Sequence, residues 1–204
     1  MQAKYGEFVN VDNVHFALIT KDDETDYTAE TPAYLAPTAE ITGEPQIENT
    51  PTYYDGVPGF NYVSEGATEL TITFSGVPAK LMAKLLGKDY DEDTGRVLDS
   101  GVPNPPDVAL SFRFQKGSDS YRYYQYLKGN FSGGAEAAAT RTDTYDVRTY
   151  QMIYTAIVTS HQWNIGNSKK GLKRIFADTD DASFEGAGAW FNSVQTPDND
   201  EGGY

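Results

Sequence analysis

Apolar and polar residues alternate with a period of two along most of the chain, which is typical of half-buried β-strands. The alternating runs are rich in β-branched and aromatic residues, which strands favour. This pattern predicts a mainly β protein. The clearest predicted strands are residues 70–75, 108–115, 121–128 and 147–158, and shorter candidates are residues 14–19, 33–41 and 172–176.

One segment, residues 78–87, follows the helical period instead. Pro78 suits the first helical position and Gly87 suits the residue that stops the helix. Because a helix of about three turns is not stable alone, we expect its apolar face to pack on a sheet. That face carries Leu81, Met82, Leu85 and Leu86, and the opposite face carries Lys80 and Lys84.

Residues 46–66 follow neither period and are interrupted by prolines and glycines. A segment of this length inside a compact domain is usually functional or disordered. Its aromatic and aliphatic side chains argue against simple disorder. We therefore expect an extended arm that packs on a partner outside its own domain. The residues expected to make these contacts are Tyr53, Tyr54, Asp55, Val57, Phe60 and Tyr62.

The charge of the chain is strongly acidic and unevenly distributed. Among its 204 residues, 16 Lys and Arg face 30 Asp and Glu, which gives a formal net charge of −14. Residues 1–102 hold six basic and 18 acidic residues, whereas residues 103–204 hold ten and 12. Such a surface argues against tight nucleic-acid binding, which needs clustered Lys and Arg. It is compatible with a surface past which nucleic acid moves without sticking.

Residues that could carry catalysis or bind a metal are few. The chain has no Cys, which excludes disulfides and Cys-ligated zinc. His15 and His161 lie in strand-like stretches, away from any nucleophile motif. Asp89, Asp91 and Asp93 match the start of a calcium loop, but the later positions lack its glycine and glutamate. We therefore predict no catalytic residue, no cofactor and no metal site.

Two further surfaces leave alternatives open. The basic cluster of Lys169, Lys170, Lys173 and Arg174 has acidic residues nearby at 178–181, and a protein–protein contact is favoured there over a nucleic-acid site. The tyrosines of residues 121–126 suit sugar stacking, but tyrosine equally suits a half-buried sheet or an interface. A carbohydrate-binding β-sandwich module therefore stands as the alternative function.

A series of short motifs gives the chain a resemblance to a known family over nearly its whole length. In these motifs the sequence resembles the major tail protein, or tail tube protein, of long non-contractile-tailed phages of Gram-positive hosts. The motifs are Tyr53-Tyr54-Asp55, Ser64-Glu65-Gly66, residues 68–73, residues 75–78, Leu85-Leu86-Gly87, residues 126–129, Phe131-Ser132-Gly133 and residues 173–178.

The resemblance implies a fold of two packed antiparallel β-sheets flanked by one short helix, with a long extended loop and terminal arms. It also implies a structural virion protein without enzymatic activity. Copies would assemble into hexameric rings, and the rings would stack into a tube around the tape measure protein. The tube would meet tail terminator and distal tail proteins at its ends, and DNA would contact it only in passage.

An acidic lumen would repel phosphate groups and keep DNA sliding. The residues expected to line the lumen or its rim are Glu40, Glu44, Glu48, Glu65 and Glu69. Glu65 and Glu69 are expected to share a polar strand face with Thr71 and Thr73. The alternative is that these acids form an outer wall that keeps the protein soluble.

The expected organisation is one tail tube domain over residues 1–194 and a flexible tail over residues 195–204, which are polar and glycine-rich. The N-terminal residues lack the charged and apolar regions of a signal peptide, and no apolar run is long enough to cross a membrane. The expected location is the phage tail, after assembly in the host cytoplasm, without a membrane partner.

Overall fold

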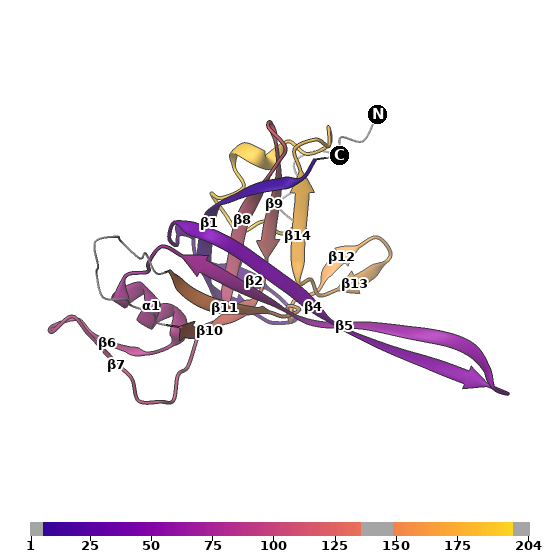
Figure 1. The fold of residues 1–204 in the computed structure, drawn as a ribbon, viewed down its shortest axis with the longest axis horizontal. Helices are drawn as coiled ribbons and strands as arrows, with labels where there is room; N and C mark the ends of the chain where they lie inside the picture. The colour runs from indigo at the N-terminus through magenta and orange to yellow at the C-terminus, as the bar shows by residue number, and fades with distance from the viewer. Residues whose placement is uncertain (1–5, 136–148, 198–204) are drawn as a thin grey trace, which may run out of the picture.

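The structure is a computed structural model that describes residues 6–135 and 149–197. Two antiparallel sheets and one short α-helix make up its body, and a long hairpin projects from it (Figure 1). The mainly β fold with antiparallel sheets and one helix is thus confirmed. Met1–Tyr5, residues 136–148 and most of the predicted tail lie outside the described residues.

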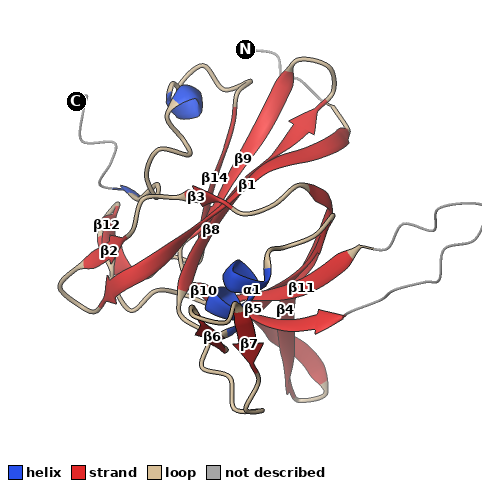
Figure 2. Ribbon diagram, turned by 90° about the vertical axis from the view of Figure 1, so that its left-hand side faces the viewer, coloured by secondary structure: helices blue, strands red, loops and turns tan. Residues whose placement is uncertain are grey.

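The larger sheet has six strands in the order β14-β9-β8-β1-β2, with β3 also paired to β1. It curls into a half-barrel, as the views in Figures 1 and 2 show. Its strands are β1 (Phe8–Asp22), β2 (Tyr27–Ala29), β3 (Ala33–Tyr34), β8 (Val108–Lys116), β9 (Ser120–Tyr126) and β14 (Arg174–Asp178).

The smaller sheet has four strands in the order β10-β11-β5-β4. Its strands are β4 (Thr38–Tyr54), β5 (Val57–Phe74), β10 (Gly129–Ala135) and β11 (Tyr150–Ala156). Two small hairpins complete the described strands: β6 (Asp89–Asp91) with β7 (Arg96–Leu98), and β12 (Trp163–Ile165) with β13 (Ser168–Lys170). The Asp-rich stretch after the helix is thus a tight turn between two short strands.

The core lies between the facing sides of the two sheets. Alternate residues of β8, such as Leu110 and Phe112, face alternate residues of β5, such as Ile72 and Phe74. Tyr154 of β11 is completely buried, and its hydroxyl donates to the Val108 carbonyl 2.7 Å away. Because every other residue of these strands is apolar, the period of two places one face of each strand in this core.

The predicted helix is α1 (Ala79–Leu86), and Gly87 follows it in the left-handed region at φ 65°. Pro78 is the residue before the first helical turn, one position earlier than expected. Leu85 and Leu86 are buried against the core, which confirms the apolar face. Figure 2 shows the helix beside β10 and β11, where it closes one end of the core. Among the described residues, the only 3-10 turn is η1 (Gly186–Gly188).

The second face of the larger sheet is also covered. Tyr123 of β9 packs against the rings of Phe184, Trp190 and Phe191, which follow β14 in the chain. Beneath them, Gln125 is 1 % exposed and donates to the Leu110 carbonyl. Aromatic residues on both faces of β9 therefore reflect a strand that is covered on both sides.

Candidate assembly surface

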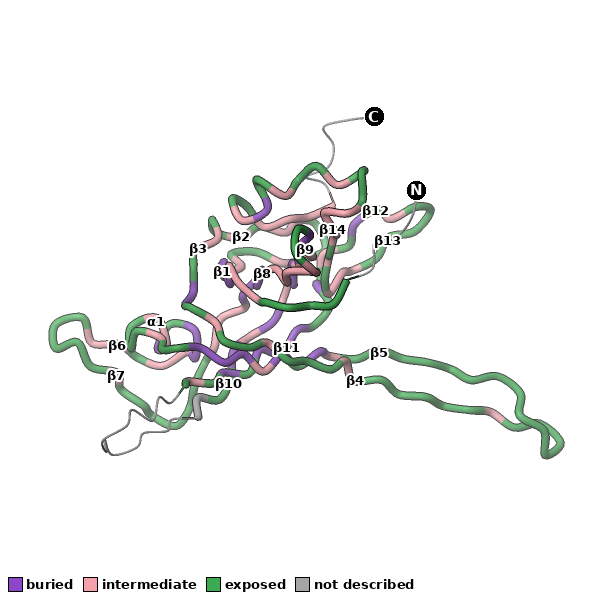
Figure 3. The backbone as a smooth tube through the Cα atoms, turned by 45° about the horizontal axis from the view of Figure 1, so that its top comes forward, coloured by how far each residue is buried: buried purple, intermediate pink, exposed green. Residues whose placement is uncertain are grey.

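The segment predicted as an extended arm is a β-hairpin. Residues 47–65, which we call the arm, form the outer parts of β4 and β5 and project away from both sheets (Figures 1 and 3). Asp55 and Gly56 form its turn with φ of 53° and 75°. Positive φ at both central residues is the geometry of a type I′ turn, for which Asp-Gly is a favoured pair.

The apolar side chains of the arm have no partner among the described residues. Figure 3 shows the arm exposed along nearly its whole length. Monomeric soluble proteins rarely expose a continuous apolar surface of this kind, and where they do it usually marks an interaction site. The exposed fractions are 64 % for Tyr53, 61 % for Tyr54, 62 % for Val57, 69 % for Phe60 and 62 % for Tyr62.

The base of the arm is held by Lys173, which sequence analysis had not connected with it. The Lys173 ammonium bonds the Glu65 carboxylate and donates to the Gly66 carbonyl 3.0 Å away. Its side chain is only 10 % exposed. The hydrogen bond from Lys173 lowers the pKa of Glu65, so the carboxylate stays ionised at neutral pH.

A β-bulge changes the faces of β5 where the arm begins. Between the pairs Pro45–Thr68 and Ile47–Glu65, β4 advances by two residues and β5 by three. An extra residue in one strand reverses the alternation beyond it. Glu65 therefore lies on the face of buried Thr68 rather than that of Glu69. The expectation that Glu65 and Glu69 share one face is wrong.

Three of the five candidate lumen acids lie on the outer face of the smaller sheet. Glu40 pairs with Thr73, and Glu44 lies directly opposite Glu69, all on the face turned away from the core. Gln46 donates to Glu69 across the two strands at 3.4 Å, which fixes it on the same face. The period of β4 continues this face to Glu48 at the start of the arm.

The acidic side chains of this outer face lie close to one another. Glu40 and Glu44 on the edge strand β4 and Glu69 on the neighbouring strand β5 are all exposed on this face. Like charges directly opposite one another destabilise a strand pair, and Glu44 beside Glu69 is such an arrangement. Repulsion between Glu44 and Glu69 therefore lowers the stability of the isolated chain.

The tyrosine-rich strand β9 does not present an open platform for a sugar. Tyr123 and Tyr126 are 4 % and 3 % exposed. Tyr124 is partly buried and lies between Phe112, Phe114 and Phe176, with ring centroids 5.2, 5.1 and 5.9 Å away. These tyrosines pack in the sheet, as the simpler of the two interpretations expected.

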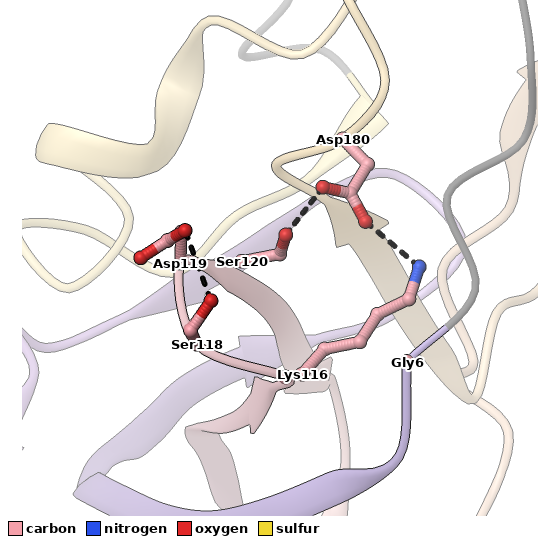
Figure 4. Close-up of a pocket in the computed structure, with 7 residues that line it drawn as sticks. Gly6, Lys116, Ser118, Asp119, Ser120 and Asp180 are labelled. Carbon is pink, nitrogen blue, oxygen red and sulfur yellow. Dashed lines mark hydrogen bonds and ion pairs between the residues drawn. The ribbon is translucent and has the colours of Figure 1, made fainter.

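A small pocket of about 150 Å³ lies at the turn between β8 and β9, lined by Gly6, residues 116–120 and Asp180. Lys116 and Asp180 point toward each other across it, with their nitrogen and oxygen 2.9 Å apart, and Ser120 also bonds Asp180 (Figure 4). Lys116 and Asp180 thus neutralise each other in the pocket, and the Ser118 hydroxyl donates to Asp119.

The histidines pack as structural side chains. His15 stacks on Phe191 at 4.7 Å, and His161 lies edge-on to Trp163 at 4.7 Å. In the described ranges, no three His, Cys, Asp or Glu side chains gather closely enough to hold a metal ion. Within the same part of the chain, no helix is long and apolar enough to cross a membrane.

Sequence comparisons give this chain no relative. No protein-family model matches it. No curated protein matches it either. Function is therefore argued from the residues and their geometry.

Proposed function

We propose that the protein is a self-assembling tail tube subunit, in which the arm and the smaller sheet join copies into stacked rings around a channel. The observation that carries this proposal is the arm, a 19-residue hairpin whose apolar side chains find no partner in the described chain. A hairpin gains little stability alone in water. An arm of this kind is useful to a protein that buries it against another chain.

Two other features support the proposal. The smaller sheet ends in β4 on one side and β10 on the other, and neither has a second partner among the described strands. Ring closure would join such edges and remove the hazard that open edges pose. The acids on its outer face, Glu40, Glu44 and Glu69, suit a channel that DNA must pass without binding. In this proposal the tape measure protein occupies the channel before DNA, and hexameric rings follow from the resemblance alone.

Electron microscopy of the purified protein in negative stain tests the proposal. Rings or tubes are expected at high protein concentration. Monomers alone at every concentration and ionic strength would refute it. Binding on a glycan array by such monomers would favour the carbohydrate-binding alternative.

Replacement of the arm aromatics tests the role of the arm directly. The variant Tyr53→Ser, Tyr54→Ser, Phe60→Ser, Tyr62→Ser should keep the fold, because all four side chains are exposed. It should lose assembly, because those side chains supply the apolar area that another copy would bury. Light scattering measures assembly, and circular dichroism checks the fold. Long tubes from this variant would show that the arm is not the joining element.

A further inference from the structure

The arm is purely acidic in its charged residues. It carries Glu48, Asp55 and Glu65, and the chain has no Lys or Arg anywhere in residues 22–79. Glu65 is neutralised at the base by Lys173. Asp55, in the turn at the tip, and Glu48, beside the base, form no ion pair with any described residue. A partner for the outer arm, by which we mean residues 53–57 around the turn, should therefore offer positive charge together with a surface on which aromatic rings can pack.

Among the described residues, one surface that offers these properties is formed by Lys169, Lys170, Arg174 and Phe176, and we call it the cationic edge. Lys169 and Lys170 lie on β13, and Figures 1 and 3 show β13 beside β14, which carries the other two residues. All four are exposed, with Phe176 at 52 %. In the described part of the chain none of the three cations forms an ion pair.

The cationic edge continues an aromatic row that crosses the larger sheet. The Arg174 guanidinium lies 5.5 Å from the Phe176 ring centre, and Arg122 lies 5.6 Å from the same ring. The row continues through Tyr124, Phe114 and Phe8, of which Phe8 is 49 % exposed. Arginine held over aromatic rings is a surface that binds further aromatic side chains and carboxylates well.

The outer arm and the cationic edge do not meet within one chain. The arm extends away from the body, with its turn far from every other element in Figures 1 and 3. Only its base reaches the residues around β14, through Glu65 and Lys173. Complementary charge on two surfaces that one chain keeps apart indicates that they meet between copies.

Resting on the proposed function, we infer that the outer arm of one copy docks on the cationic edge of a second copy. Asp55 would face Lys169, Lys170 and Arg174, and Tyr53 and Tyr54 would pack on Phe176 and the arginines. Strand β14 also has only one partner among the described strands, so its outer edge can accept backbone hydrogen bonds from the arm.

Cysteine crosslinking tests this contact, because the chain has no Cys of its own. One chain carries Asp55→Cys and a second carries Lys170→Cys, and the two are mixed, assembled and treated with a short bismaleimide. The control pairs Asp55→Cys with Asp93→Cys, an exposed position in the turn between β6 and β7. A 55–170 adduct, identified by mass spectrometry, is expected, and a 55–93 adduct is not.

Charge reversal tests the same contact without cysteine. The variant Lys169→Glu, Lys170→Glu, Arg174→Glu should weaken assembly by about tenfold or more, because like charges would then face each other. Adding Asp55→Lys to the same chain should restore assembly in part, because unlike charges would again face each other at the tip of the arm. A control, Lys80→Glu with Lys84→Glu, reverses two exposed charges on α1, which pair with Glu92 and Glu30, and should leave assembly unchanged.

The outcomes separate the two proposals. Tubes without the 55–170 adduct, or tubes unaffected by charge reversal, would overturn the inference and leave the proposed function standing. Monomers alone from the unaltered chain would overturn both. DNA binding that the three reversals abolish, in a chain whose arm does not crosslink to residue 170, would assign the cationic edge to nucleic acid and also overturn the inference.

Discussion

At the scale of single residues, Asp22 is a buried carboxylate with several charge and hydrogen-bond partners. Its side chain is 3 % exposed, and the Lys128 ammonium lies 2.6 Å from its carboxylate. Burial alone would raise the pKa of Asp22, but Lys128 and the backbone amides of Ser160 and His161 outweigh it and lower the pKa. One carboxylate therefore ties the end of β1 to the segments after β9 and β11.

Replacing this carboxylate should be costly. Asp22→Asn should lower the free energy of unfolding by about 3 kcal/mol at pH 7, because it leaves the Lys128 charge without its main partner. Urea denaturation measures the loss, and Glu24→Gln, at an exposed position nearby, should change stability by less than about 0.5 kcal/mol. A loss for Asp22→Asn no larger than this control would contradict the assigned role.

The same pair predicts a pH dependence with a definite sign. A carboxyl whose pKa is lowered by folding stabilises the fold fully above its unfolded pKa, near pH 4, and loses that stabilisation as the pH falls below it. The stability difference between the unaltered protein and Asp22→Asn should therefore shrink between pH 4 and pH 2. A constant difference over that range would show that the charge of Asp22 is not the cause.

At the scale of elements, the orientation of the arm is set at its base. The bulge near Gly66 exchanges the two faces of β5, and Lys173 then holds Glu65 and the Gly66 carbonyl. A two-stranded ribbon fixed only by its turn would bend freely about the sheet. The bulge and the lysine together give the arm a defined direction.

Removal of the lysine charge should loosen this base without unfolding the protein. Lys173→Met keeps the apolar stem but should speed amide hydrogen exchange in residues 57–66, while the free energy of unfolding falls by no more than about 1 kcal/mol. Lys84→Met, at an exposed position on α1 whose ammonium makes no bond to the arm, is the control. Equal exchange in the two variants would show that Lys173 does not hold the arm.

The elements that sequence alone predicted best are those in which one face is buried. The strands containing Leu110 and Met152 and the helix containing Leu85 show a clean period because the core selects every second or every third to fourth residue. The arm faces no core, so nothing selects a period there. The Asp55-Gly56 pair, which favours a two-residue hairpin turn, is the sequence feature that indicates this hairpin. Strand β10 was missed because Gly129, Asn130 and Ser132 have low strand propensity.

The candidate site was predictable in composition but not in geometry. Its exposed aromatics could be named from the sequence, since apolar residues without a period indicate a partner elsewhere. The strand face on which Glu65 lies could not be predicted, because a bulge of one residue leaves no clear mark in the sequence. The Lys173 contact joins residues 108 positions apart and depends on the packing of the whole fold.

At the scale of the whole molecule, the acidic and the basic side chains lie on different surfaces. The acids at Glu40, Glu44 and Glu69 lie on the outer face of the smaller sheet, whereas Arg174 lies on β14 at the edge of the larger sheet and Lys169 and Lys170 lie on the separate β12–β13 hairpin. The charge of the described chain is thus unevenly distributed in space, and in the proposed assembly repulsion between acidic faces would oppose attraction between unlike surfaces.

Reversing the acidic face should change how assembled protein treats DNA. The variant Glu40→Lys, Glu44→Lys, Glu69→Lys should still assemble, and its tubes should retain linear DNA in a sedimentation assay because Lys neutralises phosphate. Unaltered tubes should not retain it. A control with the same change in net charge, Glu24→Lys, Asp93→Lys, Glu185→Lys, separates the effect of this face from that of overall charge. Equal retention by both variants would place the three acids away from the channel.

The exposure of the arm determines how mutations in it would act. Its side chains are exposed, so substitutions there should not disturb the core and should escape the quality control that removes misfolded proteins. In the proposed assembly, a copy with an altered arm would join through its intact surfaces and offer the next copy a joint that no longer fits. One such variant in a mixed population would act as a chain terminator, so its effect would be dominant and not merely a loss.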